Sequence, residues 1–182
     1  MTGPPAVGKT TVAALLAARR SPSVHLRADA FWGFVVGGYV DPWLAEARQQ
    51  NETVARAVFA AAAELVAGGF HVVLDGVVGP WFLSELTTRC PPDRCELHYV
   101  ILLPPLDRLL ANLAGRTGHG FTSADAAAHM HRAFEAARGP YERHVLDPAA
   151  LSPEETARAV EAAVASGRVR LLPSGRSGEP GA

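Results

Sequence analysis

The sequence has little lysine, little cysteine and no long apolar run, and each shortage excludes a class of protein. Its 182 residues include sixteen arginines but a single lysine, Lys9, and a formal net charge of −1 gives no basic excess for nucleic-acid binding. No apolar stretch approaches the roughly 20 residues that a membrane span needs, and the first residues lack the apolar core of a signal peptide. We therefore expect neither nucleic acid nor a membrane as a partner.

The two cysteines, Cys90 and Cys95, are too few for a disulfide framework, and their C-x4-C spacing alone does not make a zinc site. We interpret them as free thiols, so a cytoplasmic location is expected. A composition of 48% hydrophobic and 19% charged residues is not that of a disordered chain. The length predicts one domain over residues 1–167, and a Gly/Ser/Pro-rich, flexible tail is predicted over 168–182.

The single lysine lies in a motif with a mechanical basis. Residues 3–10, GPPAVGKT, match G-x-x-x-x-G-K-[ST] at every fixed position. Glycines let such a loop direct its N–H groups at phosphate oxygens, and the N-terminus of the following helix adds a positive dipole end. Lys9 would reach the β- and γ-phosphates, and the Thr10 hydroxyl would ligate Mg²⁺. The predicted nucleotide-binding residues are Gly3, Pro4, Pro5, Ala6, Val7, Gly8, Lys9, Thr10 and Thr11. The alternative is a Gly/Pro loop that caps an ordinary helix.

Strand-like apolar runs alternate with helical patterns along the rest of the chain. Strands are predicted over residues 24–29, 70–74, 97–103 and 144–147, and helices over 10–20, 43–49, 52–67, 81–89, 106–116, 123–138 and 153–166. Ser123 and Ser152 are the expected N-caps of the last two helices. This alternation predicts the α/β class, a three-layer sandwich in which helices cover both faces of a parallel sheet. Ligands bind such sheets at the carboxyl ends of the strands. The phosphate loop, Asp29 and Asp75 should therefore lie along one edge.

Asp29 and Asp75 are the two acidic candidates, because each closes a predicted strand. Asp29 could accept the proton of an acceptor hydroxyl, or it could only cap a helix that starts at Ala30. Asp75 closes an apolar strand, as a Walker-B acid does, and could hold Mg²⁺ directly or through water. The alternative for Asp75 is a strand-end residue that caps the next turn.

Arginine and aromatic residues supply further candidates. Arg116 precedes a glycine-containing loop that could close on the γ-phosphate, or it could simply meet a helix dipole. Weaker candidates for phosphate contacts are Arg132, Arg138 and Arg143. Aromatic residues after the first strand could form the wall of a substrate pocket or belong to the core; they are Phe31, Trp32, Tyr39 and Trp43. His129 and His131 should point apart on a helix, which argues against a metal site.

Together, GPPAVGKTT, the strand ending at Asp29, VVLDG, LHYVILLPP and GRTG resemble the small P-loop kinases of adenylate-kinase-like architecture. More narrowly, they resemble the chloramphenicol phosphotransferase-like and zeta-toxin-like group over about residues 2–166. The resemblance implies a P-loop NTPase fold with a five-stranded parallel sheet of order 2-3-1-4-5, and ATP and Mg²⁺ as cofactors. It also implies that Asp29 is the general base, that Arg116 belongs to a lid, and that residues 147–149 lie near the adenine.

The family's first strand, which precedes the phosphate loop, has only Met1 and Thr2 to represent it here. Without that central strand, two buried strand edges would lack partners at about 1–3 kcal/mol for each unpaired group. We therefore expect that Met1 is an internal residue of this strand and that the true chain starts earlier. The alternative is that residues 169–172 fill the gap.

Three functions are compatible with the sequence. The first is an ATP-dependent phosphotransferase that acts on a hydroxyl of a small molecule such as an antibiotic, a sugar or a nucleotide-sugar, as a monomer or homodimer. The second is a P-loop NTPase or nucleotide-binding regulator that works through a protein partner. The third is an inactive, N-terminally truncated form. Asp29 beside an aromatic segment favours the first, since a regulatory NTPase needs a group that positions water.

Overall fold

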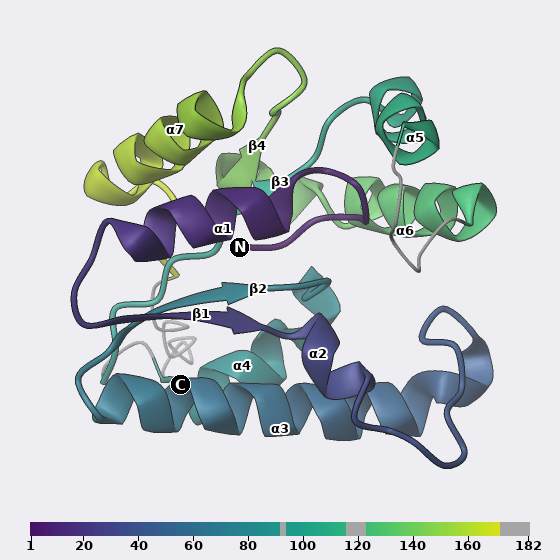
Figure 1. The fold of residues 1–182 in the computed structure, drawn as a ribbon, viewed down its shortest axis with the longest axis horizontal. Coiled ribbons are helices and arrows are strands. Elements are labelled where there is room, and N and C mark those ends of the chain that lie inside the picture. Colours follow the sequence, from purple (N-terminus) through teal and green to yellow (C-terminus); the bar gives the residue numbers. More distant parts are fainter. Residues whose placement is uncertain (92–93, 116–122, 172–182) are drawn as a thin grey trace, which may run out of the picture.

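The fold places parallel strands between layers of helices (Figure 1). The computed structural model of the protein describes residues 1–91, 94–115 and 123–171, so Arg116 lies outside the described residues. Helix α1 (Lys9–Ala18) packs on one side of the pair formed by β1 (Ser23–Arg27) and β2 (His71–Asp75), and α3 (Arg48–Ala67) covers the other side. The predicted α/β class with parallel strands is confirmed.

The strands of the described chain form two parallel pairs rather than one continuous sheet. β1 pairs with β2 in a register that sets Arg27 opposite Asp75, and β3 (Ile101–Leu102) pairs with β4 (Val145–Leu146). β3 and β4 are shorter than the strands predicted over 97–103 and 144–147. The single five-stranded sheet that the resemblance implies is therefore present only in part.

Met1 and Thr2 connect the two strand pairs. The Met1 amino group donates to the Leu74 carbonyl at 2.8 Å, the Thr2 N–H donates to Val100 O at 2.7 Å, and Leu102 N–H donates to Thr2 O at 2.8 Å. These two residues thus lie between β2 and β3, which is where the resemblance places the strand that precedes the phosphate loop. The Thr2 side chain is buried and its hydroxyl accepts from Val78 N–H at 2.8 Å.

Residues 169–171, expected to begin a tail, pair with residues 97–99. Tyr99 N–H donates to Val169 O at 2.9 Å, Leu171 N–H donates to Leu97 O at 2.8 Å, and Val169 is fully buried. Leu103 N–H donates to Leu146 O of β4. Because backbone groups alternate sides along a strand, Tyr99 N–H, four residues earlier, points to the same side, away from β2. The alternative in which this segment fills the gap between β2 and β3 is therefore wrong.

The helices agree with the predicted periodicity within a few residues, except that the stretch predicted over 43–49 is only a 3₁₀ helix, Ala45–Ala47. Both predicted serine caps are confirmed: Ser123 accepts from Ala126 N–H, and Ser152 forms a reciprocal capping box with Glu155. The remaining helices are α2 (Asp29–Trp32), α4 (Leu83–Arg89), α5 (Leu106–Ala114), α6 (Ala124–Ala136) and α7 (Pro153–Ala165), with 3₁₀ helices at Pro80–Phe82 and Gly139–His144.

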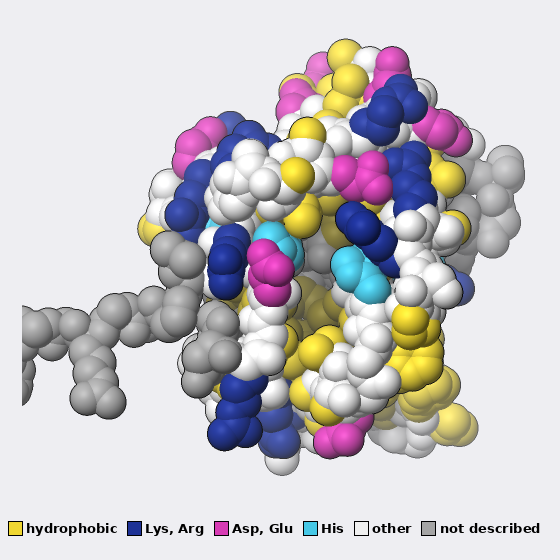
Figure 2. Space-filling model, turned by 90° about the vertical axis from the view of Figure 1, so that its left-hand side faces the viewer, with side chains coloured by type: hydrophobic (Ala, Val, Ile, Leu, Met, Phe, Trp, Pro, Cys, Tyr) yellow, Lys and Arg dark blue, Asp and Glu magenta, His cyan; other side chains and the backbone are white. Residues whose placement is uncertain are grey.

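The two larger apolar cores among the described residues join helices across the layers. One joins α1, α5 and α7 around Leu102 and Leu109, and the other joins α3, α4 and α6 around Phe59, Ile101 and Phe134. Figure 2 shows the face at the amino-terminal ends of β1 and β2, where a hollow has apolar side chains at its base and basic and histidine side chains around it. The phosphate loop leaves the sheet at the opposite, carboxyl-terminal edge. No helix among the described residues is both long and apolar enough to cross a membrane.

Candidate active site

The phosphate loop adopts a backbone that its sequence makes possible. Gly8 precedes α1 in the left-handed conformation, with φ of 84°, and Ala6 also has a positive φ of 67°. Gly3 has φ of 141°, and a Cβ there would come within 2.2 Å of the Leu102 carbonyl oxygen. The loop therefore leaves the buried Thr2 through a turn that only glycine fits, and it ends at the N-terminus of a ten-residue helix.

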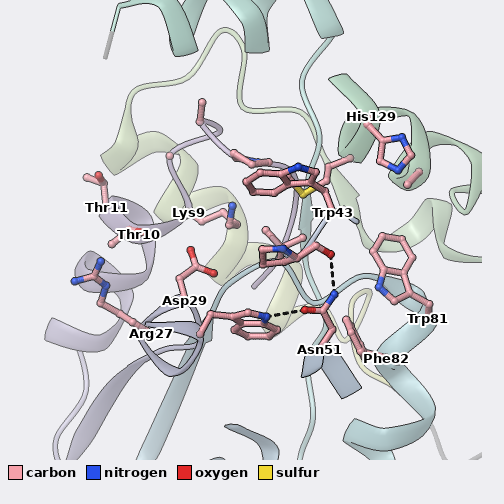
Figure 3. Close-up of a pocket in the computed structure, with 18 of the residues that line it drawn as sticks. Lys9, Thr10, Thr11, Arg27, Asp29, Trp43, Asn51, Trp81, Phe82 and His129 are labelled. Atoms are coloured by element: carbon pink, nitrogen blue, oxygen red, sulfur yellow. Dashed lines mark hydrogen bonds between the residues drawn. The ribbon is translucent and has the colours of Figure 1, made fainter. Parts of the chain in front are cut away.

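Lys9, Thr10 and Thr11 begin that helix and face the same pocket (Figure 3). The Lys9 side chain is largely buried, and its ammonium donates to the Pro4 carbonyl across the loop at 2.8 Å. The two threonine side chains are exposed to solvent. A cation inside a loop of this shape, with hydroxyls beside it, is an arrangement suited to the phosphates of a nucleotide.

Asp29 lies two residues after the end of β1 and points toward Lys9 in the pocket (Figure 3). Partial burial raises the pKa of its carboxyl, the Asp75 carboxylate adds to the rise, and Lys9 acts in the opposite direction. The nearby Val77 backbone N–H also acts to lower the pKa of Asp29. Helix α2 begins at Asp29 itself, without a side-chain cap, so the interpretation of Asp29 as the cap of a helix starting at Ala30 is wrong.

Asp75 is buried at the end of β2 and does not line the pocket. Its Oδ2 lies 3.3 Å from His25 Nε2 on the neighbouring strand, whereas its Oδ1 is buried without a hydrogen-bond partner among the described residues. A buried carboxylate oxygen with unused acceptor capacity fits a divalent cation or its bound water. The Mg²⁺ role of Thr10 and Asp75 stays a prediction, because Asp75 is not among the residues that line the pocket with Thr10.

One pocket of about 610 Å³ joins the phosphate loop to an aromatic wall. The pocket is lined by Trp32, Tyr39 and Trp43, which agrees with the interpretation of these aromatic residues as the wall of a substrate pocket. Phe31 instead packs against the core that joins α3, α4 and α6, and its ring centroid lies 5.4 Å from that of Phe34. Sequence analysis missed nine further lining residues of this pocket: Arg27, Pro42, Asn51, Val77, Trp81, Phe82, His129, Met130 and Ala133. Of these, Arg27 carried a usable signal, since it lies two residues before Asp29 at the same strand end.

A second pocket of about 350 Å³ lies on the other side of the phosphate loop. Pro148 and Ala149 line it, and both belong to the segment expected near the adenine. Arg108 and Asn112 from α5, which sequence analysis missed, also line it. The two pockets share Ala6, Gly8 and Thr11, so the phosphate loop separates a nucleoside-sized space from the aromatic one.

The weaker arginine candidates do not line either pocket. Arg138 forms ion pairs with Glu135 and Glu142, and Arg143 donates to His144 and to the Arg170 carbonyl. The two histidines of the H-x-H pair diverge as expected: His129 faces the pocket, and the buried His131 ring lies 2.8 Å from Pro104 O.

Comparisons with known proteins agree with this architecture. The AAA_33 family profile, described as an AAA domain, matches residues 1–141. No curated protein matches the sequence. The tunicamycin resistance protein of Deinococcus radiodurans superposes with a TM-score of 0.67 and 20% identity, over 94% of this chain and 96% of that chain. A protein of Chloroflexus aurantiacus J-10-fl with a provisional kinase name gives a TM-score of 0.53 and 18% identity, over 91% and 94% of the two chains.

At these identities the two structures show a shared fold and no more. The family profile covers more than three quarters of the chain, from Met1 through the first two strands to residue 141, including the phosphate loop and Asp29. Family and fold together confirm the predicted resemblance to small P-loop kinases and support a phosphotransferase in general terms. This chain belongs to the AAA_33 family of AAA domains, with a P-loop kinase-like fold.

Proposed function

We propose that the protein transfers the γ-phosphate of ATP to a hydroxyl group of a small molecule. The observation that carries this proposal is the shared pocket, since Lys9 of the phosphate loop, the Asp29 carboxylate and three tryptophans line one continuous space. A nucleotide held by the loop would present its terminal phosphate to that space. An acceptor lying against the aromatic wall would meet the phosphate beside Asp29.

The transfer needs a positioned hydroxyl, a proton acceptor and positive charge. The acceptor oxygen would bond to the γ-phosphorus, the bond from phosphorus to the β–γ bridging oxygen would break, and ADP would leave. Asp29 would take the hydroxyl proton. Its raised pKa makes it a better proton acceptor than an ordinary aspartate, while Lys9 and Arg27 supply charge at the phosphate end of the pocket.

Thr10 and Asp75 are the residues that would hold Mg²⁺, the first through its hydroxyl and the second through a bound water. When bound, Mg²⁺ would neutralise charge on the phosphate oxygens. The protein's own contribution is to fix the loop, to place Asp29 with the Val77 N–H, and to shape the acceptor space.

The experiment that tests this function is ADP release, measured with ATP alone and with each member of an acceptor panel. The panel should contain hydroxylated antibiotics, sugars and nucleotide-sugars, and it should include tunicamycin because a protein named for resistance to that compound has the same fold. The proposal expects ADP release that depends on an acceptor, together with a phosphorylated product. ATP hydrolysis that no acceptor stimulates, but that a protein partner does, would instead support a nucleotide-binding regulator. Oligomeric state and cytoplasmic location stay predictions.

A further inference from the structure

Resting on the proposed function, we propose that the acceptor is an uncharged alcohol with a flat ring, and that the pocket discriminates against acceptors that already carry a phosphate group. Two independent features of the pocket support this inference. One is the set of aromatic side chains that stay exposed around the pocket, and the other is the position of the charged side chains that line it.

All three tryptophans of the sequence line this one pocket. Trp43 and Trp81 keep 36% and 49% of their surface exposed, and Tyr39 keeps 46%. Exposed aromatic side chains gathered around one cavity mark a binding surface more often than chance. A flat ring covers such surfaces by stacking, and stacking tolerates many ring chemistries.

Two polar side chains of α3, Gln50 and Asn51, hold the wall in place. Asn51 accepts from the Trp32 indole N–H at 2.8 Å and donates to the Pro42 carbonyl at 2.7 Å, so one amide fixes two parts of the wall (Figure 3). Gln50, the residue before Asn51 in α3, holds the segment that precedes Trp43. Its side-chain amide accepts from Val40 N–H and donates to Val40 O. A wall fixed in this way loses little freedom when a ligand binds.

The charged side chains that the structure describes in this pocket lie at one end. Among the described residues that line it, the permanently cationic side chains are Lys9 and Arg27, and both lie on the phosphate-loop side, away from Trp81 (Figure 3). The polar side chains at the aromatic end are Asn51 and His129. The Asn51 amide already hydrogen-bonds through both its oxygen and its nitrogen. A phosphate on the acceptor would lose water there without a cation to replace it, and it would add negative charge near Asp29.

The test is a binding titration on protein saturated with Mg²⁺ and a non-hydrolysable ATP analogue, so that the phosphate loop is already filled. Tryptophan fluorescence reports on the pocket directly, and calorimetry confirms the affinities. The probes are two matched pairs, uridine with uridine 5′-phosphate and pyridoxine with pyridoxine 5′-phosphate, plus choline as a cation without a flat ring. We expect the uncharged member of at least one pair to bind about tenfold or more tightly than its phosphorylated partner, and than choline.

Two sets of variants identify the source of the selectivity. Trp81→Leu should weaken the uncharged probe about tenfold, as loss of one stacking surface does, without altering affinity for the ATP analogue. His129→Arg places a cation at the aromatic end and should reduce the preference for the uncharged probe, whereas the matched control His129→Gln should keep it. Because His129 and Trp81 are both exposed, these changes should leave the fold intact.

The proposal is overturned if the phosphorylated partner binds as tightly as the uncharged probe, if choline binds best, or if no uncharged probe binds. The binding test needs no chemical step, so it is separate from the test of the transfer reaction. Acceptor-stimulated ADP release with a preference for phosphorylated acceptors would overturn this inference and leave the proposed function standing. Selective binding of the uncharged probe without any phosphoryl transfer would contradict the proposed function and leave the preference of the pocket for uncharged ligands standing.

Discussion

Gly76 fixes the distance between the two strand ends that carry the acidic residues. A Cβ at this position would lie 2.5 Å from the Ala28 Cβ and 3.5 Å from Asp29 Oδ1. Ala28 is itself buried, and its N–H donates to the Asp75 carbonyl at 2.7 Å, so the two strand ends cannot simply separate. To reach 3.4 Å, the lower end of ordinary contact, the carbons would have to move apart by roughly 1 Å.

Gly76→Ala should therefore displace Asp29 from its position beside the phosphate loop. A misplacement of about 1 Å costs on the order of 100-fold in rate, and overpacking at a buried site costs about 1–3 kcal/mol in the free energy of unfolding. The affinity for ATP should change little, because the atoms nearest to the added methyl group belong to Ala28 and Asp29 and not to the phosphate loop. Steady-state kinetics with a productive acceptor, ATP-analogue titration and urea denaturation measure the three quantities.

Two controls show whether the added methyl group acts through this contact. Gly139→Ala adds the same methyl group where nothing lies within 4 Å, and it should change neither rate nor stability by much. Ala28→Gly combined with Gly76→Ala removes the contact, and it should restore most of the rate. A Gly76→Ala protein with an unchanged kcat, or a double variant that is no faster than the single one, would refute the reasoning.

Three other perturbations test separate parts of the structure. Lys9→Ala should lower turnover by orders of magnitude without unfolding the protein, and Lys9→Arg should not restore it, because a planar guanidinium does not replace a compact ammonium in the loop; kinetics and circular dichroism check both. Thr2→Val should cost about 1–3 kcal/mol in urea denaturation because it leaves the buried Val78 N–H without an acceptor. Burial lowers the pKa of His144 in the folded protein below its ordinary value of 6.5. As the pH drops below 6.5, the unfolded chain therefore binds a proton at His144 more readily than the folded chain, and the free energy of unfolding should fall. His144→Gln should weaken this pH dependence in thermal melts.

The parts of the fold that depend on local signals could be predicted from the sequence. The phosphate loop, the serine caps at Ser123 and Ser152, and the β1 and β2 strands follow from motifs and periodicity that act over a few residues. The pairing of residues 169–171 with 97–99 could not be predicted, since a short polar-flanked segment carries no signal for a partner 70 residues away. Strand partners are decided by the packing of the whole sheet.

In the candidate site, too, the residues with a local sequence pattern could be predicted, and those placed by tertiary packing could not. Asp29 was found because a strand-end acid has a recognisable pattern, and the structure places it with Lys9 in one pocket. Trp81 and Asn51 were missed because each reaches the pocket from a helix far away in the sequence, and only the tertiary contacts of α3 and of the Pro80–Phe82 turn bring them there. Arg116 lies outside the described residues, so its role in a lid stays a prediction.

The most direct test of the account is the rate of phosphoryl transfer by Asp29→Asn, measured together with its ATP affinity and melting temperature. As the proton acceptor, Asp29 should contribute about 10²–10⁴-fold to kcat, and the amide should leave ATP affinity almost unchanged. The amide is nearly isosteric and still offers an oxygen to the Val77 N–H, so the fold should persist. A variant that keeps its rate with acceptor, whatever its melting temperature, would contradict the central claim, because Asp29 would then not be the proton acceptor.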